Sequence, residues 1–165
     1  MIQNDYRLIW RLLRRLGVPA HSVDDAVQQV FLIAAERLDD IREHSERAFA
    51  FGTALRVAQT LRRQRAREET SAEGDRNVSP LPGPEELADQ HRARELLGRV
   101  LDELPLELRT VFVLFELEGM TSPEIAELAA VPLGTVASRL RRARTRFREL
   151  VAHETGQKLV VGEEP

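Results

Sequence analysis

The sequence predicts an all-α protein made of two small helical domains that a flexible linker joins. Apolar residues recur every three or four positions through most of the 165 residues, which is the spacing of one helix face, and no stretch alternates as a half-buried strand does. The segment REETSAEGDRNVSPLPGP, residues 67–84, contains three prolines and two glycines and offers little to bury. The expected division is therefore a first domain at 1–67, a linker at 68–84, a second domain at 85–152 and a C-terminal tail at 153–165.

Three helices are expected in the first domain. The first covers residues 5–16, and the following GVPA ends it. The second begins near Ser22 and keeps an apolar face as far as Leu38, and the third runs from about Glu46 to Arg67 and becomes basic in its last turns. The apolar faces of the three helices consist of Leu8, Ile9, Leu12, Leu13, Leu16, Val23, Val27, Val30, Phe31, Ala34, Phe49, Ala54, Val57, Ala58 and Leu61.

Four helices are expected in the second domain. One begins at Pro84 and reaches Leu104, because proline suits the first turn of a helix. Another ends at Gly119, because glycine suits the position after the last turn. Two shorter helices follow, and the chain after Val151 is expected to fray.

The segment MTSPEIAELAAVPLGTVASRLRRARTRF, residues 120–147, has the pattern of a helix-turn-helix motif. Thr121 and Glu124 have the spacing of a capping box, in which the two side chains satisfy free backbone amides at a helix start. Apolar or small residues follow at the positions through which two helices pack, and AAVP supplies the turn. Pro132 suits the start of the second helix.

The second helix of this motif has a polar face rich in arginine. Six arginines lie between residues 139 and 148, with no acidic residue among them. Hydroxyl groups near the start of a helix and arginines further along are typical of helices that contact base edges and phosphates in DNA. The alternative is a charged, solvated helix face that binds nothing. The residues expected to contact DNA are Thr135, Ser138, Arg139, Arg141 and Arg142.

The formal net charge of −3 does not argue against a nucleic-acid partner, because the charges are segregated along the chain. Residues 1–67 carry 12 arginines against 8 acidic residues, whereas residues 68–91 carry 1 against 7. Of the 24 basic residues, 23 are arginine, whose planar side chain suits phosphate and guanine.

Composition and motifs exclude several other classes of protein. There is no cysteine, hence no disulfide framework, and the four histidines are scattered without ligand spacing. No glycine-rich phosphate loop and no nucleophile beside a base is present, so the sequence predicts no enzyme, metal site or cofactor. The longest apolar run, VFLIAA at 30–35, is too short to cross a bilayer, and no signal peptide is visible, which predicts a cytoplasmic protein.

Two parts of the chain resemble bacterial RNA polymerase sigma factors of the extracytoplasmic-function (ECF) group. LDELPLELRTVFVLFELEGMTSPEIAELAAVPLGTVASRLRRARTRF is similar to their fourth conserved region. WRLLRRLGVPAHSVDDAVQQVFLIAAERL and RAFAFGTALRVAQTLRRQRARE resemble their second region. The resemblance implies a subunit that binds core RNA polymerase and directs it to promoter DNA, and that is held inactive by an anti-sigma factor.

The resemblance also implies three sets of contacts. The helix containing DDAVQQVF would dock on the clamp helices of the polymerase through Asp25, Gln28, Gln29 and Leu32. The helix from Phe49 to Arg67 and the preceding loop at 39–45 would bind the −10 element and help hold its melted strand, with a base flipped into a pocket. Its phosphate contacts would be Arg56, Arg62 and Arg63. The helix-turn-helix would read the −35 element.

The chain departs from the family pattern at four positions. Gln29 stands where an acidic residue is usual, and Phe49 replaces a tryptophan. Ala130 stands where many such turns have glycine, which costs about 1 kcal/mol if the backbone φ there is positive. Ala137 occupies a position that is often lysine or arginine. These departures predict a divergent member of the family or a distinctive promoter.

Two other functions compete with this interpretation. A stand-alone helix-turn-helix regulator would carry a similar motif, but it leaves the first domain unexplained. A helical adaptor that never touches DNA would tolerate replacement of Arg139, Arg141 and Arg142 without a change in nucleic-acid affinity.

Overall fold

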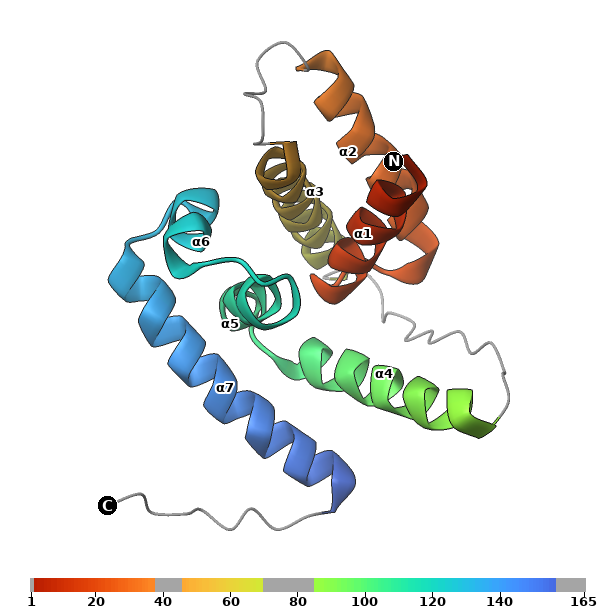
Figure 1. Ribbon diagram of the computed structural model, residues 1–165, viewed down its shortest axis with the longest axis vertical. Helices are drawn as coiled ribbons and strands as arrows, with labels where there is room; N and C mark the ends of the chain where they lie inside the picture. The colour runs from red at the N-terminus through yellow and green to blue at the C-terminus, as the bar shows by residue number, and fades with distance from the viewer. Residues whose placement is uncertain (1, 38–45, 70–84, 157–165) are drawn as a thin grey trace.

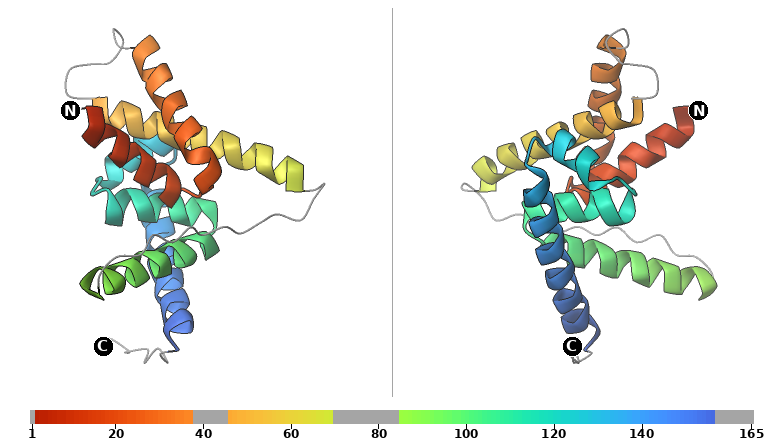
Figure 2. Two further views of the ribbon diagram at one scale, coloured as in Figure 1. Left: turned by 90° about the vertical axis from the view of Figure 1, so that its right-hand side faces the viewer. Right: turned by 60° about the vertical axis from the view of Figure 1, so that its left-hand side comes forward.

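The computed structural model describes residues 2–37, 46–69 and 85–156, and every regular element within them is helical (Figure 1). The all-α prediction is therefore confirmed. Helices α1–α3 form one group and α4–α7 form another, and residues 70–84, which hold most of the predicted linker, lie outside the described residues. The C-terminal half of α3 and the N-terminal half of α4 project away from the rest of the molecule (Figure 2).

The first group consists of α1 (Ile2–Arg15), α2 (Ala20–Glu36) and α3 (Glu46–Glu69). As predicted, the chain turns between α1 and α2 at Gly17, whose φ is +93°. Most residues of the predicted apolar faces meet in the core, with Leu12, Leu13 and Leu16 fully buried, whereas Ala34 and Phe49 are half-buried and lie outside the core cluster. Two further residues of α3, Phe51 and Leu55, are also buried there and were not among those expected.

The second group consists of α4 (Glu85–Glu103), α5 (Leu106–Phe112), α6 (Ser122–Ala129) and α7 (Leu133–Thr155). A π-helical segment, η2 (Val113–Leu117), continues α5, and Gly119 follows it with a φ of +68°. The predicted stop at this glycine is confirmed.

Helix α7 differs from the prediction in length. It has 23 residues rather than being a short helix, and it continues past Val151 to Thr155. Leu150 and Ala152 are buried, and Glu154 pairs with Arg99 of α4 at 2.9 Å, so packing against α4 sustains the last turn. Gly156, with a φ of +66°, ends the helix.

The two groups of helices pack against each other, and their buried apolar residues form one continuous cluster. Arg15 pairs with Glu118, and Arg47 of α3 donates a hydrogen bond to the Glu118 carbonyl at 3.0 Å. Leu128 of α6 packs over Gly52 of α3, and Arg109 of α5 packs against Gly17. We call these four contacts (Arg15–Glu118, Arg47–Glu118, Gly52–Leu128 and Gly17–Arg109) the closing contact.

Candidate nucleic-acid interface

Helices α6 and α7 form the predicted helix-turn-helix, and the turn has the expected chemistry. The carboxylate of Glu124 accepts hydrogen bonds from both the backbone N–H and the hydroxyl of Thr121, at 2.7 and 2.6 Å. These hydrogen bonds lower the pKa of Glu124 from its ordinary value, because they favour the charged form. Ala130 has the left-handed conformation, with φ 53° and ψ 47°, so the strain anticipated for a non-glycine residue is present.

The inward face of α7 consists of the residues that the sequence predicted. Val136, Leu140 and Ala143 are buried, and Phe147 stacks on Phe112 of α5 with ring centroids 4.5 Å apart. This packing fixes the rotation of α7 about its axis. It leaves Ser138, Arg141 and Arg142 exposed, with Thr135 and Arg139 half-buried at the flank.

The arginines of α7 fall into two kinds. Three of them have acidic partners. The partners of Arg139 and Arg144 come from other elements, so the sequence alone does not reveal these two pairs. The pairs are Arg139 with Glu107 at 3.5 Å, Arg144 with Glu116 at 2.6 Å and Arg146 with Glu149 at 3.1 Å. Arg141, Arg142 and Arg148 have no ion-pair partner among the described residues, although the Arg148 side chain donates a hydrogen bond to the Arg144 carbonyl at 3.4 Å.

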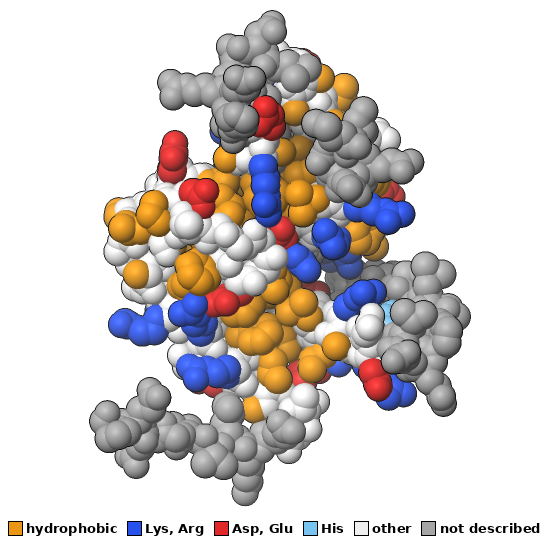
Figure 3. Space-filling view, viewed as in Figure 1, with side chains coloured by type: hydrophobic (Ala, Val, Ile, Leu, Met, Phe, Trp, Pro, Cys, Tyr) orange, Lys and Arg blue, Asp and Glu red, His pale blue; other side chains and the backbone are white. Residues whose placement is uncertain are grey.

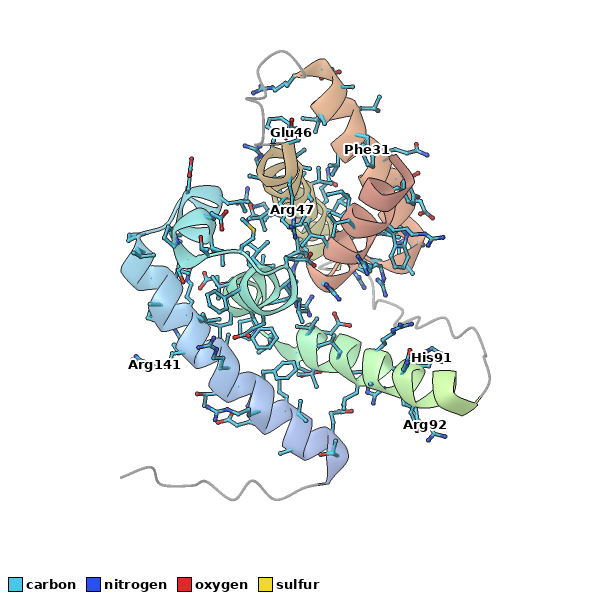
Figure 4. The ribbon with its side chains drawn as sticks, viewed as in Figure 1. Phe31, Glu46, Arg47, His91, Arg92 and Arg141 are labelled. Atoms are coloured by element: carbon cyan, nitrogen blue, oxygen red, sulfur yellow. The ribbon has the colours of Figure 1, made fainter. Side chains whose placement is uncertain are left out.

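The unpaired arginines lie on the outer side of the molecule. Figure 4 labels Arg141 on the side of α7 away from α4. Basic side chains also gather along the edge that α7 forms in Figure 3. Arg141 and Arg142 therefore keep their full hydrogen-bonding capacity for an external anion.

The four residues predicted to dock on the polymerase share one exposed face of α2. Asp25, Gln28, Gln29 and Leu32 follow one another at helical spacing, and each is exposed. Leu32 is 65% exposed, which is high for a large apolar side chain. The four side chains are therefore accessible to a partner, and their role in docking on the polymerase stays a prediction.

A cavity of about 320 Å³ lies between α2 and α3. Its apolar walls include Phe49, and its polar groups include Thr53 and Arg56. The hydroxyl of Thr53 is buried and has no hydrogen-bond partner, so it is free to bind a ligand in the cavity. The residues that line the cavity are Gln29, Ile33, Arg37, Phe49, Thr53, Arg56, Val57 and Thr60.

Sequence reasoning did not foresee Thr53 and Thr60 as parts of this cavity. The signal was present, because Phe49, Thr53, Arg56 and Thr60 follow one another at helical spacing on α3. The structure also places Gln29 at two sites at once, on the exposed face of α2 and in the wall of the cavity.

The three arginines predicted for the −10 element do not lie together. Arg56 and Arg63 are exposed and seven residues apart, which places them on the same side of α3. Arg62 is half-buried and turned toward the closing contact, where its guanidinium lies near Gly17. The predicted loop at 39–45 lies outside the described residues.

Arg109 is the most deeply buried charged residue of the closing contact, at 2% exposure. Burial lowers the pKa of Arg109, and the positive charge of the nearby Arg62 lowers it further. Asp102 accepts a hydrogen bond from Arg109 at 2.9 Å and raises the pKa in the opposite direction. Its Nε has no hydrogen-bond partner. No short-range pattern in the sequence marks Arg109 or Glu118 as buried, because their environment comes from helices distant in the chain.

Within residues 2–37, 46–69 and 85–156, no helix is long and apolar enough to cross a membrane. These residues also hold no cluster of three or more histidine, aspartate or glutamate side chains suited to a metal ion.

Comparison with known proteins identifies two family segments. The model of sigma-70 region 2 matches residues 1–68, and that of sigma-70 region 4 matches residues 94–147. The chain is 31% identical over 160 residues to RNA polymerase sigma factor NccH of Alcaligenes xylosoxydans xylosoxydans, covering 92% of this chain and 84% of that protein.

Two further comparisons agree with these matches. The chain is 30% identical over 152 residues to ECF RNA polymerase sigma factor SigE of Mycolicibacterium smegmatis, covering 90% of this chain but only 59% of that protein. A co-crystal structure of the sigma factor RpoE with the anti-sigma factor NepR from Bartonella quintana has the same fold. Its TM-score is 0.77 at 21% identity, with 91% of this chain and 93% of that chain covered.

Proposed function

The chain belongs to the ECF group of RNA polymerase sigma factors, and from that premise we propose that it binds core RNA polymerase and directs it to specific promoters. In this proposal residues 1–67 form the domain that binds polymerase and the −10 element. Residues 85–152 form the domain that reads the −35 element, and 68–84 and 153–165 are the linker and the tail. The observation that carries the proposal is the exposed face of α7, where Ser138, Arg141 and Arg142 stand together without acidic partners among the described residues.

The reading of the −35 element follows from the geometry of α7. Its packed face fixes the helix, so the opposite face is presented as a rigid surface that fits the major groove. Arg141 and Arg142 can donate paired hydrogen bonds to guanine or phosphate, and Ser138 can bond to either base type. The arginines with acidic partners, such as Arg144 and Arg146, would contribute less, because DNA would first have to displace a carboxylate.

The cavity between α2 and α3 supports a role at the −10 element. Its volume is sufficient for a nucleobase, Phe49 offers a stacking surface, and Thr53 offers a buried hydroxyl without a partner. Arg56 lines the same cavity and remains exposed, which suits a phosphate beside a flipped base. Arg63 extends the basic surface along α3, whereas Arg62 becomes available only when the closing contact separates.

The exposed face of α2 is assigned to core polymerase. Leu32 supplies an apolar centre, and Asp25 and Gln28 supply polar groups around it. Gln29 borders the cavity as well, so it would link polymerase docking to the melted strand. The protein would act in the cytoplasm, where bacterial RNA polymerase works.

The closing contact must separate before both promoter elements are bound. Elements centred about 25 base pairs apart are separated by about 85 Å along B-DNA, at roughly 3.4 Å per base pair. A compact chain of 165 residues has a radius of gyration of about 15 Å. The arrangement in Figure 1 is therefore a free or inhibited state of the protein, and an anti-sigma factor is the partner expected to hold it.

The test is run-off transcription with core RNA polymerase, with and without this protein, on DNA upstream of its own gene. Discrete transcripts that depend on the protein are the expected result. A footprint by the protein alone, without a transcript, would support a stand-alone regulator instead. Neither signal, on this DNA and on a random promoter library, would favour the helical adaptor.

A further inference from the structure

One exposed leucine of α7 has no structural explanation. Within the described residues the large apolar side chains that stand exposed are Tyr6, Leu32 and Leu133. Tyr6 donates a hydrogen bond to Asp24, and Leu32 lies on the proposed polymerase-binding face. Leu133 is 52% exposed and is the first residue of α7.

The residues beside Leu133 on α7 are small and uncharged. A Cβ added at Gly134 would meet no atom within 4 Å, so the first turn is open on that side. Ala137 lies one turn further on the same side as Leu133 and is exposed. The exposed basic residues of the helix begin only at Arg141, and Figure 3 shows apolar side chains over the α6–α7 turn, with basic ones further along α7.

Leu133 is not needed to complete the core. Val136 and Leu140, on the inward face, are 0% and 5% exposed and fill the space that α7 covers. Leu133 instead lies at the N-terminal end of α7. In a recognition helix, the residues at this end contact the base edges in the major groove. The apolar group that the major groove presents is the C5-methyl group of thymine.

We propose that Leu133, with Ala137 beside it, contacts the C5-methyl group of a thymine in the −35 element and makes that position selective for thymine. The contact is a specificity determinant added to the hydrogen bonds of Ser138 and Arg141. It rests on the proposed function of α7 as the −35 reader. Long basic side chains at positions 133 or 137 would block so close an approach, and the chain has none there.

The test replaces each thymine of the −35 element, one at a time, by deoxyuridine, which removes only the methyl group. Run-off transcription with core polymerase and this protein should fall about fourfold at one such position, the effect of one buried methyl group. With Leu133→Ala the same substitution should have no effect. Because Leu133 is exposed, this variant should keep the helix content and melting temperature of the parent protein.

Leu32→Ala serves as the matched control, since it removes another exposed leucine that lies away from α7. It should keep the ratio between thymine and deoxyuridine templates, whatever its total yield. A wild-type protein indifferent to deoxyuridine at every position, or a Leu133→Ala variant that keeps the ratio, overturns the methyl contact. Transcription that ignores all base changes in the −35 element overturns the proposed function of α7, and the contact with it.

Discussion

Arg15 of α1 and Glu118, at the end of η2, form an ion pair across 103 residues, with Nη1 and Oε1 2.7 Å apart. The Glu118 side chain is 3% exposed and that of Arg15 is 28% exposed, so the carboxylate has lost most of its water. Arg47 reinforces the contact through the Glu118 carbonyl, and Figure 4 labels it where α3 meets the C-terminal helices. This ion pair thus joins the group α1–α3 to the group α4–α7.

Arg15→Ala should open the closing contact. Removing the cation leaves a desolvated carboxylate, which costs about 1–3 kcal/mol or more, and separation of the two groups returns Glu118 to water. The sequence has no cysteine, so spin labels at Ala35→Cys and His153→Cys would report one distance between α2 and α7. A longer and broader distance distribution is expected for Arg15→Ala, and an unchanged one for the exposed Arg11→Ala. Identical distributions for both variants would contradict a role for the ion pair.

Gly17→Ala should destabilise the protein through two independent effects. The φ of +93° disfavours any residue with a Cβ by about 1 kcal/mol or more. The added Cβ would also collide with the guanidinium of Arg109 and lie 3.0 Å from Nη1 of Arg62. Gly98→Ala is the control, because nothing lies within 4 Å and the helical site should gain about 0.5–1 kcal/mol. Urea denaturation measures the unfolding free energy of the two variants. Equal changes in that free energy for Gly17→Ala and Gly98→Ala would contradict the close contact between Gly17 and Arg109.

Ala130→Gly should stabilise the turn before α7 by about 1 kcal/mol, because glycine adopts the left-handed conformation without strain. The neighbouring Ala129→Gly should have the opposite sign, because residue 129 is the last helical residue of α6 and glycine is a poor helix former. The melting temperatures of the two variants provide the measurement. A loss of stability in both would show that the methyl group of Ala130 makes a packing contact that outweighs the strain.

The accuracy of sequence-based prediction here depends on the range of the interaction. Glu124, Ala130 and Gly119 were placed correctly because caps and turns are decided by neighbours within a few residues. The acidic partners of Arg139 and Arg144 were missed because Glu107 and Glu116 come from other elements. The same holds for the deep burial of Arg109 and Glu118, and for Arg62, which local spacing grouped with Arg56 but the fold turns toward Gly17.

Arg142→Ala should weaken promoter binding by the holoenzyme across all −35 sequences and reduce the slope of log affinity against log salt by about 1, as loss of one phosphate contact does. Arg141→Ala and Ser138→Ala should instead alter the preference among −35 sequences by about 1–3 kcal/mol per affected base pair. Arg146→Ala is the control, because its guanidinium is paired with Glu149. Equal behaviour of all four variants would place the DNA-reading face elsewhere.

The capping box predicts how α6 responds to acid. Hydrogen bonds from Thr121 hold the pKa of Glu124 below its usual value of about 4.3. The folded-state pKa is thus lower than the unfolded one, so the stabilisation is fully present above about pH 4.3 and is lost as the pH falls through the folded value.

Thr121→Ala removes the hydroxyl, the largest cause of the shift, and should raise the pKa of Glu124 toward its usual value. A carboxyl-detected NMR titration of Glu124 in both proteins measures this, and Glu124→Gln should abolish the corresponding acid dependence of the unfolding free energy. An unchanged pKa in Thr121→Ala would mean that the hydroxyl does not stabilise the charged carboxylate.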